Sequence, residues 1–165
     1  MSQLDAFLRW CHPDLLVERL RHASACWHVL QALAIDPERC CAPEAGSLSL
    51  MECSGVQLGL SSAVLASRAE PAGRAPSFPL QPKQASLWVL ALLQQPDREP
   101  CDPLDAHHWL FWVVPSHQLH PDRRSMALNP LIRAHGDGLT RDHLQDAVSS
   151  VLRSSASRQG VPPLQ

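Results

Sequence analysis

Two pairs of histidines have the residue type and spacing that suggest metal chemistry. They are His107-His108 and His117-x-x-His120. Imidazole nitrogens bind zinc, but a zinc site in a protein takes three or four ligands, and no cysteine lies near the second pair in the sequence. That pair also follows Pro115 in an expected loop, not on a helical turn. We therefore expect surface histidines, with a metal site as the alternative.

Gly59-Leu-Ser61-Ser-Ala63 has the outline of the G-x-S-x-A turn that carries the nucleophile of serine hydrolases. That turn requires a helix directly behind the serine and the large sheet of a hydrolase core. A chain of 165 residues is too short for such a core. We therefore expect Ser61 to be a packing residue.

Thiol chemistry is the third possibility that the sequence raises. The spacing C-x-x-C, which would indicate a zinc ribbon or a thioredoxin motif, does not occur. The chain is also long for a scaffold held together by disulfides. We therefore expect free, buried thiols at all six cysteines, namely Cys11, Cys26, Cys40, Cys41, Cys53 and Cys101.

The composition limits the class of protein. Hydrophobic residues make up 45% of the chain and the net charge is −2, which is typical of a globular protein without a general attraction for nucleic acid. No apolar run approaches the roughly 18 residues of a membrane span, and residues 1–10 lack the apolar centre of a signal peptide. We expect a cytoplasmic protein with no membrane partner, in which residues 1–153 form one domain and residues 154–165 a flexible tail.

The elements that would position these residues follow from the hydrophobic periodicity. A helix is expected over Leu15–Ala34, ended by Asp36-Pro37. Its apolar stripe consists of Leu16, Leu20, Ala23, Trp27, Leu30 and Ala34. An alternating pattern then predicts a hairpin over Ser47–Leu60, with a turn at Glu52-Cys53-Ser54-Gly55.

The second half of the chain reads as two further strands and a helix. Ser86–Leu93 is apolar on both faces, which indicates a central strand, and Trp109–Val114 is a second strand. Arg68–Pro82 reads as a loop, and Met126–Leu131 as a short edge element. A last helix starts at Thr140, with Leu139 packed against Leu144. We expect core positions for Trp27, Trp88, Trp109 and Trp112, and an exposed contact for Trp10.

Several local phrases follow one another in a recognisable order. Asp102-Pro-Leu-Asp105 precedes Trp109-x-Phe-x-Val-Val-Pro115, and Lys83–Leu93 stands just before both. Phe7-Leu-Arg-Trp10, Asp14-Leu-Leu16 and residues 21–35 open the chain. In this order and spacing, over most of residues 7–152, the chain resembles bacterial restriction-endonuclease-like proteins of the PD-(D/E)XK superfamily.

The resemblance implies an α/β fold, a small mixed β-sheet flanked by helices, and the remains of a nuclease site. In that superfamily an acid on the first helix, an aspartate on the first hairpin strand and an E-x-K on the second gather around Mg²⁺. The metal polarises the phosphate and helps to generate hydroxide, while the lysine stabilises the developing charge. Alternation along a strand puts the E and the K on one face.

Each of these positions is replaced in this chain. The helix acid corresponds to Cys26, the aspartate to Ser49 and the E-x-K to Gly59-Leu60-Ser61, and the glutamine that follows corresponds to Ala66. Serine and glycine cannot hold Mg²⁺ in place of two carboxylates. We therefore expect a catalytically inactive nuclease-like domain, without metal or cofactor, that binds a protein partner or a second copy of itself.

An active Mg²⁺-dependent DNA endonuclease with displaced catalytic residues is the alternative. Convergence of Glu44, Glu52 and Lys83 on one pocket would favour it. Contact with DNA is open under either reading, because four arginines in expected loops could face phosphates. These are Arg68, Arg74, Arg123 and Arg124.

Overall fold

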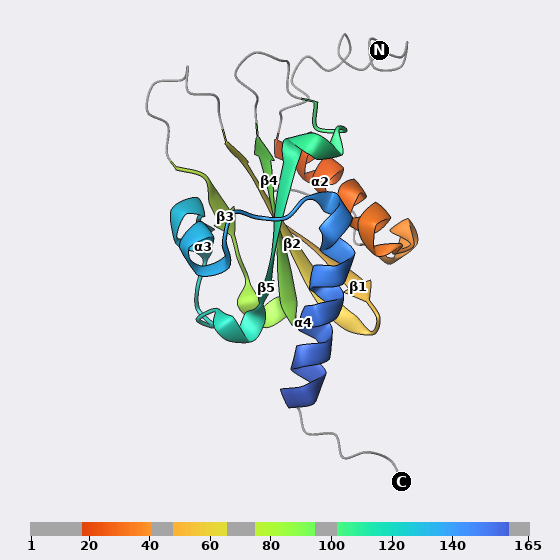
Figure 1. Cartoon of the computed structure of the whole chain (residues 1–165), viewed down its shortest axis with the longest axis vertical. Coiled ribbons are helices and arrows are strands. Elements are labelled where there is room, and N and C mark those ends of the chain that lie inside the picture. The colour runs from red at the N-terminus through yellow and green to blue at the C-terminus, as the bar shows by residue number, and fades with distance from the viewer. Residues whose placement is uncertain (1–17, 41–47, 66–74, 95–101, 159–165) are drawn as a thin grey trace.

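The computed structural model describes residues 18–40, 48–65, 75–94 and 102–158. Its centre is a four-stranded mixed sheet with strand order β1-β2-β4-β5 (Figure 1). β1 and β2 are antiparallel, β2 and β4 parallel, and β4 and β5 antiparallel. The strands are β1 (Leu48–Cys53), β2 (Val56–Leu65), β4 (Leu87–Gln94) and β5 (Trp109–Pro115).

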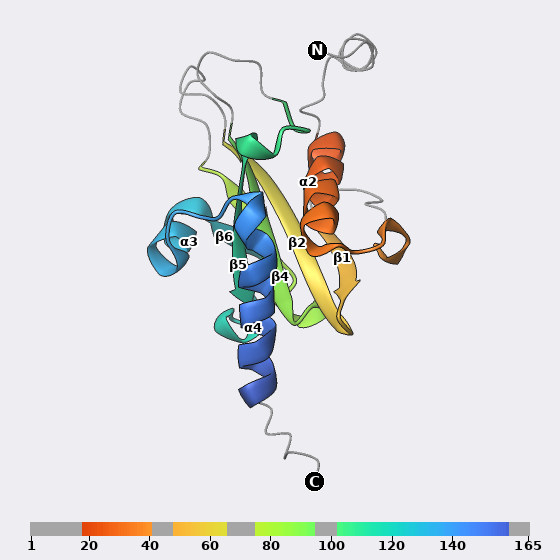
Figure 2. The same cartoon turned by 45° about the vertical axis from the view of Figure 1, so that its right-hand side comes forward.

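Helices cover both faces of this sheet, which confirms the predicted α/β class. α2 (Glu18–Leu33) and α4 (Leu144–Arg158) pack on one face, where they share an apolar cluster with alternate side chains of the strands. α3 (Leu128–His135) lies on the other face beside a two-stranded ribbon (Figure 2). The ribbon pairs β3 (Ser77–Pro79) with β6 (Ser125–Ala127).

The hairpin and the central strand form as predicted. Ser54 and Gly55 have φ angles of 52° and 75°. Two successive positive φ angles are what a two-residue turn between antiparallel strands requires. β4 lies between β2 and β5, and seven of its eight residues are buried, as expected for a strand covered on both faces.

Two predictions about the connecting segments were wrong. Part of the expected loop Arg68–Pro82 forms β3, which gains order by pairing with β6, almost 50 residues later in the chain. The expected edge element Met126–Leu131 divides into β6 and the start of α3. Pro130 is compatible with this helix because it stands in the first turn, where the backbone N–H has no intrahelical partner.

The C-terminal helix also differs from the prediction. A 3-10 turn, η5 (Arg141–His143), precedes α4, and α4 runs to Arg158, so residues 154–158 are helical. The backbone of Leu139 forms a bridge with Phe111 of the edge strand β5. The remaining 3-10 turns are η1 (Pro37–Arg39), η2 (Pro82–Gln84), η3 (Ala106–His108) and η4 (Ser116–Gln118).

The N-terminal helix buries a different stripe from the predicted one. Trp27 is 48% exposed, so its predicted place in the core was wrong. Two histidines, His22 and His28, are buried in its stead. The other three tryptophans predicted to be core are buried, and Trp10 lies outside the described residues. None of the described helices is long and apolar enough to span a bilayer.

Candidate functional site

The interface between α2 and the hairpin holds a buried polar network. The two ring nitrogens of His22 lie 2.8 Å from Ser62 Oγ (Nδ1) and 2.8 Å from Ser49 Oγ (Nε2). Cys26 Sγ donates to Ser49 Oγ over 3.5 Å. A neutral imidazole donates from one nitrogen and accepts at the other, so a single ring can satisfy both serines.

This network results from helix and strand periodicity acting together. His22 and Cys26 stand four residues apart on α2, so they share one face of the helix. Ser49 pairs with Leu60 across the hairpin, and Ser62 is two residues further along β2, so all three point to the face that α2 covers. Sequence reasoning missed His22 because it lies off the apolar stripe that the helix was expected to bury.

The surroundings of the network are apolar. Leu58, Leu60 and Met51 are each no more than 1% exposed and share a cluster with Cys26. Ser49 and Ser62 are 6% and 1% exposed. Both hydroxyls are therefore shielded from solvent by the packing of α2 on the hairpin.

The structure brings together Cys26 and Ser49 but separates them from Gly59 and Ser61. Gly59 pairs with Trp88 of β4, and an ideal Cβ at Gly59 would stand 2.7 Å from the indole ring, in the cluster on the opposite face of the sheet. Ser61, two residues on, shares that opposite face. The side chains of β2 that face Ser49 and Cys26 are Leu58, Leu60 and Ser62.

The resemblance assigns the E-x-K to Gly59-Leu60-Ser61, and the structure places Gly59 and Ser61 on the face of β2 opposite to Ser49. The two charged positions of that motif must share a face with the aspartate position, and a slip of one residue along a strand turns every side chain to the other face. Leu58-x-Leu60 meets this condition, since Leu60 is directly opposite Ser49. The face that would carry charged ligands is filled with leucine.

Cys26 and Cys40 form a thiol pair at the edge of the same interface. Their side chains hydrogen-bond to each other. This contact lowers the pKa of Cys40 to about 7, against the opposing effect of burial. The same contact, followed by burial, raises the pKa of Cys26. Cys40 and Cys53 are partly buried, in contrast to the predicted full burial, and the other three cysteines lie outside the described residues.

Two of the four predicted phosphate-binding arginines are described, and they share a pocket. Arg123 and Arg124 line a hollow of about 360 Å³ together with Lys83, whose Nζ lies 2.9 Å from Asp122 Oδ1. Both members of that ion pair are mostly exposed, so solvent screens the pair. Arg68, Arg74 and Ala66 lie outside the described residues.

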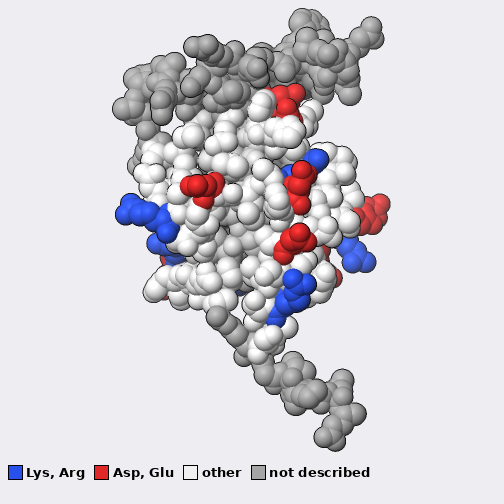
Figure 3. Space-filling view, viewed as in Figure 1, with Lys and Arg blue, Asp and Glu red and all other residues white. Residues whose placement is uncertain are grey.

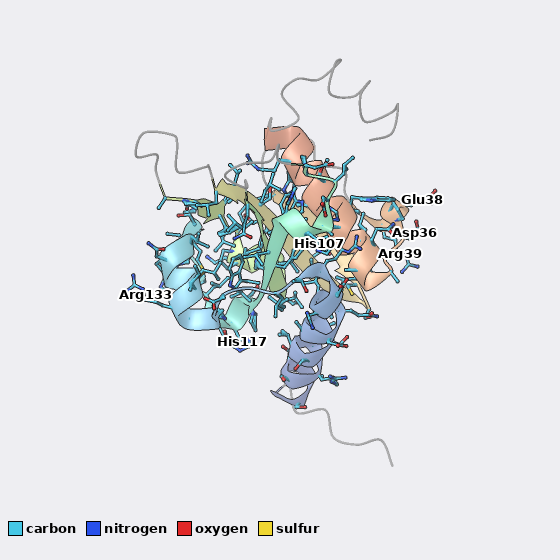
Figure 4. The ribbon with its side chains drawn as sticks, turned by 45° about the horizontal axis from the view of Figure 1, so that its top comes forward. Asp36, Glu38, Arg39, His107, His117 and Arg133 are labelled. Atoms are coloured by element: carbon cyan, nitrogen blue, oxygen red, sulfur yellow. The ribbon has the colours of Figure 1, made fainter. Side chains whose placement is uncertain are left out.

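The two described residues of the alternative enzyme, Glu52 and Lys83, do not converge. Glu52 is exposed and lines a hollow of about 270 Å³ beside Asp36 and Arg39, at the end of α2. Lys83 lines the separate pocket that it shares with Arg123 and Arg124, and Glu44 lies outside the described residues. Figure 4 shows Asp36, Glu38 and Arg39 gathered at η1.

The histidine pairs are distributed along the molecule. His107 stands in η3 and His117 in η4, at opposite ends of β5 (Figure 4). His108 Nδ1 lies 3.1 Å from the Asp102 backbone, and His120 Nδ1 accepts from the Asp122 N–H. Among the described residues, no group of three or more His, Cys, Asp or Glu side chains is arranged to hold a metal ion.

His28 connects α2 to the segment before β5 through a hydrogen bond. Its Nε2 donates to the Pro103 carbonyl oxygen over 2.9 Å, and Trp109 Nε1 donates to the same oxygen over 2.8 Å. Burial lowers the pKa of His28, while the hydrogen bond to Pro103 acts in the other direction. Next to these anchored residues in the chain are Trp27 and Leu104, which are 48% and 53% exposed.

The surface seen in Figure 3 carries scattered acidic and basic side chains. Among the described residues visible in that view, no basic band runs across the face that bears α4. A band of that kind is the usual footprint of a nucleic-acid backbone.

No family model matches the chain, and no curated protein and no solved structure matches it either.

Proposed function

We propose that this chain is a non-catalytic binding or assembly domain built on a restriction-endonuclease-like scaffold. The order of elements supports the scaffold: a helix, a hairpin, a strand parallel to the second hairpin strand, an antiparallel strand and a last helix. Among the described phrases, residues 83–93 span η2 and β4, and residues 102–115 span η3 and β5. The proposal of this scaffold concerns the fold, and the activity has to be argued from the site.

One observation carries the non-catalytic part of the proposal. On the proposed scaffold, the positions that would carry converging carboxylates correspond to Cys26, Ser49, Leu58 and Leu60, which are all buried here. Mg²⁺ requires hard oxygen ligands and retains several of its waters, so it needs both carboxylates and space. A packed interface of leucines, a serine and a thiol provides neither. A domain of this kind keeps its stability when its catalytic groups are replaced, because core packing holds it together.

The binding part of the proposal rests on the surface near α2. Trp27 and Leu104 expose large apolar side chains, and tryptophan is enriched among the residues that dominate protein interfaces. The adjacent His28–Pro103 hydrogen bond connects the two segments that carry them. The partner we propose is a protein chain, either another protein or a second copy of this one.

A nicking assay on supercoiled plasmid tests the non-catalytic reading. We expect no cleavage with Mg²⁺ or Mn²⁺ by the natural protein, in any fraction across the purification peak. We expect the same of a Ser49→Asp, Leu58→Glu, Leu60→Lys variant, because correct placement of metal, water and phosphate depends on supporting residues as well. Chelator-sensitive cleavage by the natural protein that Glu52→Ala abolishes would establish the alternative, a Mg²⁺-dependent endonuclease with displaced ligands.

Anion binding is a second candidate function, favoured by the pocket that Lys83, Arg123 and Arg124 line. Arginine binds phosphate through two parallel hydrogen bonds, and such contacts make affinity dependent on salt. We expect a labelled DNA duplex to bind weakly, and an Arg123→Gln, Arg124→Gln variant to lower the slope of log K against log salt by about one per lost phosphate contact. An unchanged slope, measured by fluorescence anisotropy, would remove this candidate. Arg133→Gln, on α3, is the matched control.

A further inference from the structure

Cys40 reaches the interface between α2 and the sheet through the path of the chain after α2. The helix ends at Leu33, and Ala34 turns the backbone with a φ angle of 51°. After η1, Cys40 forms an antiparallel bridge with Met51 of β1. Residues paired in this way point their side chains to the same face, so Cys40 lies on the face of β1 that α2 covers.

Cys26 meets Cys40 from the helix side. Both residues belong to or pack against the same apolar cluster, and their thiols hydrogen-bond to each other. The second contact of the Cys26 thiol is with Ser49 Oγ. Two cysteines that stand 14 residues apart in the sequence are thus neighbours in space, and neither is in a disulfide.

The two thiols have different access and different acidity. Cys26 is 4% exposed, whereas Cys40 is only partly buried. A pKa of about 7 makes a substantial fraction of Cys40 thiolate at neutral pH, and the thiolate is the form that attacks disulfides. The pKa of Cys26 is raised, so Cys26 remains a thiol. Cys40 is therefore the attacking residue and Cys26 the resolving one.

We propose that Cys26 and Cys40 form a redox-active dithiol, which a low-molecular-weight disulfide oxidises to an intramolecular disulfide. The Cys40 thiolate attacks one sulfur of the small disulfide, forming a mixed disulfide and releasing one small thiolate. Cys26 then loses its proton and attacks Cys40 Sγ, which releases the second small thiolate. In total two protein thiols are oxidised, one small disulfide is reduced to two small thiols, and both protons go to those thiols.

Oxidation would also raise the stability of the fold against unfolding. The bond would join the middle of α2 to residue 40, which is bridged to β1, and would close the segment 26–40 into a loop. A closed loop restricts the unfolded chain, so the oxidised protein should unfold at a higher temperature than the reduced protein. The Cys26–Ser49 contact would be lost, while Ser49 keeps its hydrogen bond to His22.

Peptide mapping of the full chain tests the proposal with glutathione disulfide as the oxidant. The reduced protein is incubated with it, the remaining thiols are alkylated, and the protein is cleaved with trypsin. Cleavage after Arg21, Arg39 and Arg68 places Cys26 alone in residues 22–39, and places Cys40, Cys41 and Cys53 in residues 40–68. We expect these two peptides to be linked, with fragmentation of the pair locating the bond at Cys40.

Four variants separate this bond from other disulfides. Cys41→Ser and Cys53→Ser, the matched controls, should keep the link, and Cys40→Ser should lose it. Cys26→Ser should stop at the mixed disulfide and carry glutathione on Cys40. Thermal unfolding of the oxidised and reduced natural protein is the second readout and needs no variant. A link that persists in Cys40→Ser, or a natural protein whose thiols remain fully alkylated after incubation, would overturn the proposal.

Discussion

A single imidazole organises the interface between α2 and the hairpin. His22 is fully buried and contacts serine hydroxyls on both hairpin strands. Burying a polar group is costly unless it is hydrogen-bonded, and here the hydroxyls of Ser49 and Ser62 provide the bonds. Ser49 is thereby one partner of a buried hydrogen-bond network that includes His22 and Cys26.

The second buried histidine of α2 makes stability depend on pH. The pKa of His28 is lowered from 6.5 by burial, so the folded state keeps the ring neutral. As pH falls through about 6.5, the unfolded chain binds more protons than the folded chain. Stability is therefore full above that pH and declines as pH falls toward the lowered pKa of the folded state. His135, whose pKa burial also lowers, contributes with the same sign.

Urea unfolding above and below pH 6.5 measures this dependence. We expect a smaller free energy of unfolding at the lower pH, and a flatter profile for His28→Gln than for the natural protein. His107→Gln, at an exposed position in η3, is the control and should keep the natural profile. A His28→Gln profile parallel to that of the natural protein would contradict the role assigned to this residue.

At the scale of elements, β2 and β4 approach closely where Gly59 faces Trp88. The indole ring occupies the place of the missing side chain, since an added Cβ would stand 2.7–2.8 Å from three ring atoms. Two residues along, the Ser61 hydroxyl is buried without a hydrogen-bond partner. The indole of Trp88 thus leaves no room for a side chain at position 59.

Alanine substitutions at these two positions should have opposite effects on stability. Gly59→Ala forces the indole or the strands to move, and overpacking of this kind costs about 1–3 kcal/mol. Ser61→Ala removes an unpaired buried hydroxyl, so we expect it to be neutral or to stabilise the fold by about 1 kcal/mol. Chemical denaturation of both variants checks the contrast. Equal destabilisation by both would mean that the Ser61 hydroxyl has a role beyond packing.

At the scale of the whole molecule, the arrangement separates a packed interior from a surface suited to association. The α2-facing interior is filled, while Trp27 and Leu104 are exposed on segments that His28 connects. Truncating a tryptophan at the centre of an interface commonly costs 2 kcal/mol or more, which corresponds to roughly 30-fold weaker association. Self-association of this chain should therefore depend on Trp27.

Sedimentation velocity over a range of concentrations measures that dependence. We expect the sedimentation coefficient of the natural protein to rise with concentration, and that of Trp27→Ser to stay at the monomer value. Leu65→Ser, at a second exposed apolar position, is the matched control and should behave like the natural protein. A natural protein that remains monomeric at all concentrations would show that the proposed partner is not a second copy. Association that persists in Trp27→Ser would contradict the assignment of this surface.

Local patterns in the sequence determined the elements in which each face has the same environment, buried or exposed, along its whole length. β4 is apolar throughout because both of its faces are covered, and the hairpin alternates with period two, so both follow from hydrophobicity alone. Ser54 and Gly55 form the turn because both have positive φ angles, and a glycine at such a position is a turn signal that the sequence itself shows. The α/β class followed from the order of these elements.

Tertiary structure alone decided which side of α2 is buried, which residues of β2 share a face with Ser49, and where Cys40 lies. Hydrophobicity placed Trp27 inside, but the buried face of α2 carries His22, which contacts two serines of the hairpin, and His28, which donates to the Pro103 carbonyl. The faces of β2 depend on pairing with Ser49, and a one-residue error in a sequence comparison reverses them. The Cys26–Cys40 pair depends on a bridge between segments distant in the chain, which no local pattern encodes.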